Sequence, residues 1–136
     1  MNILLDASVI MAIILNEPNK DTAIKLTKSS ILLSPGMISY EIGNALISLY
    51  KRHKLRKDEV IEAYHDFENI PIRVLEVSME RALEISCKYN IYAYDAYYLE
   101  TAKRLKLPLI TFDISMRNVA LDMNIPVLTE KQNENI

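Results

Sequence analysis

The chain has 136 residues, half of them hydrophobic, and 16 Lys and Arg against 18 Asp and Glu, for a formal net charge of −2. This length and composition predict one globular domain with a substantial core. The charge balance lacks the basic footprint that nucleic-acid-binding proteins usually carry, and the presence of only two glycines excludes a glycine-rich phosphate-binding loop.

The sequence carries no targeting or membrane signal. No apolar run reaches the roughly 18 residues that a membrane span requires. Residues 1–16 are apolar, but they lack a basic start and a cleavage site and contain Asp6, so they do not resemble a signal peptide. The single Cys87 excludes an internal disulfide and is typical of a reducing compartment. We therefore expect a cytoplasmic protein that does not contact a membrane.

Short apolar strands alternate with amphipathic helices from one end of the chain to the other. The expected strands are 2–5, 31–33, 70–75, 109–112 and 126–129. The expected helices are 6–14, 18–29, 37–53, 57–69, 78–89, 94–105 and 114–123. This alternation predicts an α/β fold, a three-layer α/β/α sandwich with a mainly parallel central sheet. We expect one domain over 1–129 and a polar tail at 130–136.

Four acidic residues are expected at one edge of this sheet. Asp6, Asp95 and Asp113 fall at strand ends or at the helix starts beside them, and Glu41 lies in the first turns after the second strand. The carboxyl ends of parallel strands and the helix starts that follow them share one edge of an open sheet. Taken singly, Asp6 is explained as a helix N-cap and Glu41 as a flanking residue that reaches solvent. Taken together, the four predict a functional site.

An acidic cluster of this kind predicts a metal site. Two carboxylates about 5 Å apart repel by roughly 3 kcal/mol at an effective dielectric of 20, so such a site has raised pKa values or binds a cation. Oxygen ligands select Mg²⁺ or Mn²⁺ and not zinc. We expect Asp6 and Asp95 to be the main ligands, Asp113 to complete or support the site, and Glu41 to hold or deprotonate a water.

Four segments together resemble the PIN-domain family and are most similar to the VapC-type toxins of prokaryotic toxin–antitoxin pairs. These segments are Asp6-Ala7-Ser8, Glu41–Leu46, Tyr94–Ala102 and Leu109–Asp113. Each motif alone is weak, but the four occur in order over nearly the whole chain. Tyr94 and the pair Tyr97-Tyr98 make the third motif more aromatic than is usual in the family.

The resemblance implies a small nuclease fold with an acidic, metal-binding centre, and hence a metal-dependent endoribonuclease. It matches Asp6, Glu41, Asp95 and Asp113 to the family's acids, and Ser8, Asn44 and Thr111 to its supporting polar residues. The Ser8 and Thr111 hydroxyls are expected to orient carboxylates or a metal-bound water. Asn44 lies one helical turn from Glu41 and is a candidate hydrogen-bond partner for it. The resemblance also implies a VapB-like antitoxin and a homodimer.

An RNA substrate requires positive charge beyond the metal. Residues 51–57 hold five Lys and Arg, and Arg52, Lys54 and Lys57 are the candidate phosphate contacts. The same cluster is also explained as the cationic end of a helix and a solvated turn.

Two other functions were weighed from the residues. The first is a catalytically silent binding module whose acids hold a protein partner or RNA. The second is a receiver-like phosphoryl-transfer domain, which is disfavoured because Asp6-Ala7-Ser8 lacks a second Asp and Thr111-Phe112-Asp113 lacks a Lys.

Overall fold

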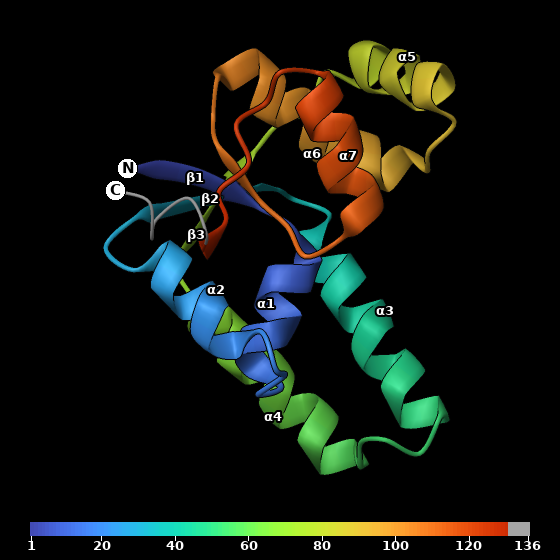
Figure 1. Ribbon diagram of the computed structural model, residues 1–136. Helices are drawn as coiled ribbons and strands as arrows, with labels where there is room; N and C mark the ends of the chain where they lie inside the picture. Colours follow the sequence, from blue (N-terminus) through green and yellow to red (C-terminus); the bar gives the residue numbers. More distant parts are fainter. Residues whose placement is uncertain (131–136) are drawn as a thin grey trace.

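A four-stranded sheet lies between two layers of helices in the computed structural model, which describes residues 1–130 (Figure 1). The strands are β1 (Asn2–Leu5), β2 (Ile31–Pro35), β3 (Ile72–Leu75) and β4 (Leu109–Ile110). They are ordered β3-β2-β1-β4, and every pairing is parallel. The expected three-layer α/β/α architecture with a mainly parallel sheet is therefore confirmed.

Seven helices connect and cover the strands in the described part of the chain. They are α1 (Ala7–Ile14), α2 (Lys20–Thr27), α3 (Ile38–Lys51), α4 (Lys57–Glu68), α5 (Met79–Tyr89), α6 (Ala93–Leu105) and α7 (Ile114–Asp122). Helices α1 to α4 lie on one side of the sheet and α5 to α7 on the other (Figure 1).

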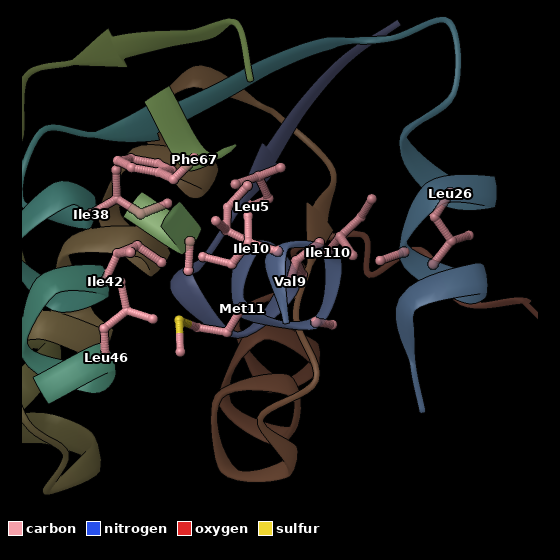
Figure 2. Close-up of a cluster of buried hydrophobic side chains, with 14 of the residues drawn as sticks. Leu5, Val9, Ile10, Met11, Leu26, Ile38, Ile42, Leu46, Phe67 and Ile110 are labelled. Carbon is pink, nitrogen blue, oxygen red and sulfur yellow. The ribbon is translucent and has the colours of Figure 1, made fainter. Parts of the chain in front are cut away.

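The alternation of side chains along β1 divides the core into two clusters. Ile3 and Leu5 face the α1–α4 layer, where they join Ile10 of α1 and Ile42 of α3 (Figure 2). Leu4 faces the other layer and packs in the cluster that contains α6 and α7. All three β1 side chains are buried, as expected of a strand that is covered on both faces.

The C-terminal strands are shorter than the sequence predicts. Strand β4 ends at Ile110 because the backbone N–H of Phe112 donates to the Ser8 hydroxyl, 3.0 Å away, and not to a neighbouring strand. The strand expected at 126–129 is reduced to one bridge, between Val127 and Leu109. The strand expected at 70–75 begins at Ile72, directly after Pro71, and lies at the sheet edge as β3, where a proline is tolerated.

The ends of the helices lie within a few residues of the expected positions. Pro18 precedes α2 and does not form its first turn, because the helix begins at Lys20. The domain bounds of 1–129 remain a prediction. Of the expected polar tail, residues 131–136 lie outside the described residues, whereas Glu130 accepts a 3.0 Å hydrogen bond from Thr22 on α2. Within residues 1–130, no helix combines the length and apolar character required to cross a membrane.

Candidate functional site: an acidic cluster at the sheet edge

The strand order places a crevice between β1 and β4. The chain proceeds from β1 outward through β2 to β3 and then returns to the opposite side of β1 to form β4. In an open parallel sheet, ligands bind beyond the carboxyl ends of the strands at such a reversal. Asp6 follows β1, and Thr111 and Asp113 follow β4, so these residues meet at the crevice.

Asp6 is the most deeply buried of the four acids, with 4% of its surface exposed. It is the N-cap of α1, and its two oxygens accept hydrogen bonds from different hydroxyls. Ser8 donates to Oδ1 at 2.6 Å and Thr111 donates to Oδ2 at 2.5 Å. Burial raises the pKa of Asp6 from 3.8 to about 6, although these hydrogen bonds oppose the shift.

A chain of hydrogen bonds connects Asp6 to Asp113 across the crevice. The Thr111 hydroxyl donates to Asp6 and also accepts from the backbone N–H of Asp113 at 3.0 Å. Asp113 in turn caps α7 by accepting from the N–H of Met116 at 3.0 Å. Thr111 therefore holds two acids at a fixed separation while it remains buried itself.

Glu41 lies in the first turn of α3 and has an unusual environment. Its Oε1 atom is buried and has no hydrogen-bond partner among residues 1–130. Burial and, to a smaller extent, the charges of Asp6 and Asp95 raise the pKa of Glu41 to about 7. The candidate partner Asn44 is exposed and forms no hydrogen bond with Glu41 in the described chain.

Asp95 lies in the first turn of α6, at the outer side of the cluster. Burial and the charge of Asp113 raise its pKa above the ordinary value of 3.8. Asp95 also lines a hollow of about 430 Å³ together with Asn90, Ile91, Tyr92 and Ser115. One of the acids is therefore accessible to a ligand that enters from the surface.

The mutual effects on pKa show that the four acids form one electrostatic unit. Asp6 is coupled to Glu41 and Asp113, and Asp95 is coupled to the same two residues. None of the four forms an ion pair with a Lys or Arg in the part of the chain that the structure describes. The cluster therefore carries negative charge that the described residues do not neutralise.

The donor set has the chemistry of a site for a hard divalent cation. Carboxylate oxygens, which all four acids supply, suit Mg²⁺ and Mn²⁺. No three acidic, His or Cys side chains within residues 1–130 converge closely enough to form a ready-made chelate. A Mg²⁺ ion usually keeps several waters and uses only one or two carboxylates, so it does not require such a chelate.

Sequence reasoning missed Tyr98, which lies among these acids. Tyr98 is on α6, only 1% of its surface is exposed, and its hydroxyl contacts Glu41 and Ser34. Burial and the charges of Glu41 and Asp6 raise its pKa, so the hydroxyl stays protonated. Tyr98 follows Asp95 by three residues, which places both on one helix face, so this spacing is the signal that could have identified it.

The cationic candidates are divided among different surfaces. Arg52 lines a hollow of about 360 Å³ together with Ser8 and Phe112, next to the acids. Lys54 lines a second hollow at the α3–α4 turn, and Lys57 lines a third between α3 and α4. The structure therefore places Arg52 in the same hollow as Ser8, which donates to Asp6, and places Lys54 and Lys57 in other hollows.

Comparison with known proteins assigns the family. The model of the PIN domain matches residues 3–121, which is most of the chain. The chain belongs to the PIN-domain family. No protein of curated function matches it by sequence.

Several solved structures share the fold. PAE2754 from Pyrobaculum aerophilum is 23% identical, with a TM-score of 0.69 over 88% of this chain and 79% of that chain. VapBC2 from Rickettsia felis, bound to a promoter DNA fragment, is 15% identical, with a TM-score of 0.65 over 94% of this chain and 98% of that one.

A third solved structure is VapC20 from Mycobacterium tuberculosis, a toxin that cleaves the sarcin–ricin loop. It is 15% identical, with a TM-score of 0.61 over 85% of this chain and 93% of that one. At these identities the likeness establishes a common fold, and the family assignment supports a nuclease in general terms.

Proposed function

We propose that this PIN-domain protein is a metal-dependent endoribonuclease and the toxin of a VapBC-type toxin–antitoxin pair. The observation that carries the proposal is the coupling of Asp6, Glu41, Asp95 and Asp113 into one acidic unit at the crevice between β1 and β4. Family membership and the RNA-cleaving toxin among the structural neighbours support this reaction class.

In this proposal the acids divide the work according to their surroundings. Asp6 and Asp95 would hold Mg²⁺ or Mn²⁺, with Asp113 completing the site. Ser8 and Thr111 keep the Asp6 carboxylate in place through the two hydroxyl hydrogen bonds. A divalent cation bound there would neutralise the scissile phosphate and acidify a water. Glu41, whose raised pKa lies near neutrality, has the basicity to accept a proton from the attacking water.

The RNA path in this proposal runs past Arg52. This side chain lines the same hollow as Ser8, which donates to Asp6, so a phosphate near Arg52 would lie close to the acids. Lys54 and Lys57 would contact the RNA farther from the cleaved bond. Lys103 and Arg104 are less available, because Lys103 donates to the carbonyl of Met123 and Arg104 pairs with Glu100.

The partners proposed for the chain are a VapB-like antitoxin, a second copy of the chain and an RNA substrate. The antitoxin is supported by the VapBC2 complex among the structural neighbours. The homodimer rests on the family resemblance. Tyr92 is an exposed aromatic side chain that would suit such an interface.

The competing function is a catalytically silent module that uses the acids only to hold a partner. None of the four acids forms an ion pair within residues 1–130, which favours a metal-dependent site over this alternative, because buried acids that serve only to maintain the fold are normally paired. A cleavage assay separates the two functions directly.

The test is cleavage of total cellular RNA by the purified wild type, Asp6→Asn and Asp95→Asn, each with Mn²⁺, Mg²⁺ or EDTA. The wild type should cleave with either metal and lose activity in EDTA, and each variant should lose at least about 100-fold, because a metal ligand contributes several kcal/mol to the transition state. Glu84→Gln, on the exposed face of α5, is the matched control and should retain full activity.

Two outcomes would contradict the proposal. Cleavage that survives both EDTA and the substitutions would place the activity elsewhere, in another site or a contaminant. A folded wild type that binds RNA or a protein partner but cleaves none of the cellular RNA would favour the silent module.

A further inference from the structure

Two buried polar atoms at the acidic cluster lack partners and contact each other. The Glu41 Oε1 atom and the Tyr98 hydroxyl are both shielded from solvent, and neither has a hydrogen bond of ordinary geometry within residues 1–130. One is an acceptor and the other a donor, and the two groups interact across the contact between α3 and α6. Unpaired buried groups are rare in native proteins, so such a complementary pair requires an explanation.

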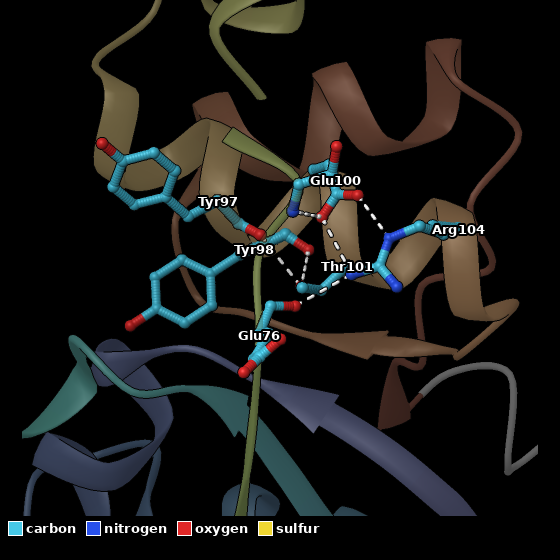
Figure 3. A network of polar contacts seen from close by, with 7 residues as sticks. Glu76, Tyr97, Tyr98, Glu100, Thr101 and Arg104 are labelled. Carbon is cyan, nitrogen blue, oxygen red and sulfur yellow. Dashed lines mark hydrogen bonds and ion pairs between the residues drawn. The ribbon is translucent and has the colours of Figure 1, made fainter. Parts of the chain in front are cut away.

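The position of Tyr98 is set by its helix and not by a flexible loop. Its ring is fully buried, and Figure 3 shows that the rings of Tyr97 and Tyr98 leave α6 in different directions, with Tyr98 pointing toward the sheet. The neighbouring Tyr97 is half-buried and packs edge-to-face on Tyr94 with ring centroids 5.7 Å apart. The fold therefore aims one tyrosine hydroxyl, and not its neighbour, at the acids.

Two groups near the Tyr98 hydroxyl could accept its proton in a hydrogen bond, Ser34 and Glu41. The nearby Ser34 hydroxyl is fully buried and uses its own proton on the Pro35 carbonyl at 3.0 Å. Ser34 is therefore not available as a donor to Glu41. Between a hydroxyl oxygen and a carboxylate oxygen, the carboxylate is the stronger acceptor.

We propose that the Tyr98 hydroxyl is a positioning group for Glu41, donating a hydrogen bond to Oε1 and fixing the carboxylate at the crevice. Glu41 is only half-buried as a residue, although its Oε1 atom is buried. Tyr98 does not react itself. This inference rests on the proposed nuclease function for its effect on catalysis, but the contact exists whether or not the protein cleaves RNA.

The experiment is a double-mutant cycle with Tyr98→Phe and Glu41→Gln, measured by urea unfolding in EDTA. Groups that interact give non-additive effects, and we expect the unfolding equilibrium constant of the double variant to differ at least threefold from the product of the single effects. Tyr97→Phe is the control, because it removes a tyrosine hydroxyl from the neighbouring position. Its effect on the free energy of unfolding should add to that of Glu41→Gln. Additive effects of Tyr98→Phe would overturn the proposal.

A second arm measures steady-state cleavage of an RNA substrate. Tyr98→Phe should lower kcat about tenfold with KM within about twofold, because a misaimed carboxylate impairs the chemical step and not substrate binding. Tyr97→Phe should leave kcat unchanged. If the cycle shows coupling but the wild type cleaves no RNA, the contact stands and the proposed function fails. If the wild type cleaves and Tyr98→Phe keeps the wild-type kcat, the positioning role fails alone.

Discussion

Two buried carboxylates in this protein, Glu100 and Asp6, have different partners. Glu100 on α6 is 2% exposed and lies in an ion pair with Arg104, with nitrogen and oxygen 2.6 Å apart (Figure 3). It also accepts a hydrogen bond from the backbone N–H of Ser78, while Arg104 donates to the carbonyl of Glu76. Asp6 is buried almost as completely, but hydroxyls and a backbone N–H are its only hydrogen-bond donors in the described chain, without a cation.

The difference distinguishes an acid that stabilises the fold from acids whose charge is left without a partner in the described chain. Glu100 and its cation lie one helical turn apart, and together they hold the segment before α5 against α6. At the crevice, the four acids have no cationic partner within residues 1–130, and the pKa values of Asp6, Glu41 and Asp95 are raised. A cluster of this kind is suited to a cation from solution, because only an external ligand removes the remaining repulsion.

The largest expected effect on stability comes from breaking the Glu100 contact. Glu100→Ala should lower the free energy of unfolding by about 3 kcal/mol, because Arg104 and the Ser78 N–H lose a buried partner. Glu100→Gln, which keeps one acceptor oxygen, should lose less. Urea unfolding measures both. A Glu100→Ala loss below about 1 kcal/mol would mean that Glu100 is not the structural acid of the comparison.

Divalent cations should stabilise the protein through the crevice acids and not through Glu100. At a Mn²⁺ concentration ten times the dissociation constant, the free energy of unfolding should rise by about 1.4 kcal/mol. The gain should vanish in Asp6→Asn and persist in Glu100→Gln. Thermal unfolding with and without Mn²⁺ provides the measurement, and a gain that survives Asp6→Asn would locate the cation elsewhere.

When metal is absent, the titration of Asp6 should make the stability of the protein depend on pH. Its folded pKa of about 6 lies above the ordinary 3.8, so the folded state binds the proton more tightly and stability falls as pH rises through this window. Asp6 alone should lower the free energy of unfolding by about 1.3 kcal/mol between pH 5 and pH 7. The difference between wild-type and Asp6→Asn urea curves in EDTA isolates this contribution. A flat difference would show that Asp6 does not have a raised pKa.

The smallest effects are expected at the cationic surface. Arg52→Glu and Lys54→Glu should each weaken RNA binding several-fold and flatten the dependence of affinity on salt, since each phosphate contact contributes about 0.7 to the slope for a single strand. Arg52→Glu should have the larger effect, because Arg52 shares a hollow with Ser8. Lys28→Glu, which follows α2 at the opposite edge of the sheet, is the control. If the salt dependence of RNA affinity is unchanged in these variants, the cationic residues do not contact RNA and are explained by the end of helix α3 alone.

Local sequence patterns predicted most of the fold and the approximate location of the acids. The spacing of apolar residues identified each described helix, and the unbroken run of Asn2–Leu5 identified a strand buried on both faces. The proline at position 71 marked the edge strand. Short-range signals of this type act within a few residues, so one sequence is enough to detect them.

Contacts between distant residues were not predicted in the same way. The sequence suggested Asn44 as a hydrogen-bond partner for Glu41. In the structure Asn44 is exposed, and the residue that contacts Glu41 is Tyr98, 57 positions further along the chain. The seven-residue basic segment looked continuous, yet the turn after α3 sends Arg52 and Lys54 to different hollows. Helix packing decides these neighbours, and no local pattern records it.

The sequence by itself therefore determined the α/β alternation and which acids follow which strands, because both depend on hydrophobic period and chain order. Only the tertiary structure decided that β4 lies beside β1 and that Thr111 donates to Asp6. It also decided that Glu100 is neutralised by Arg104 while the crevice acids lack a cation within residues 1–130. The physical reason is that charge and hydrogen-bond satisfaction are properties of the folded neighbourhood, which forms only when segments far apart in the chain come into contact.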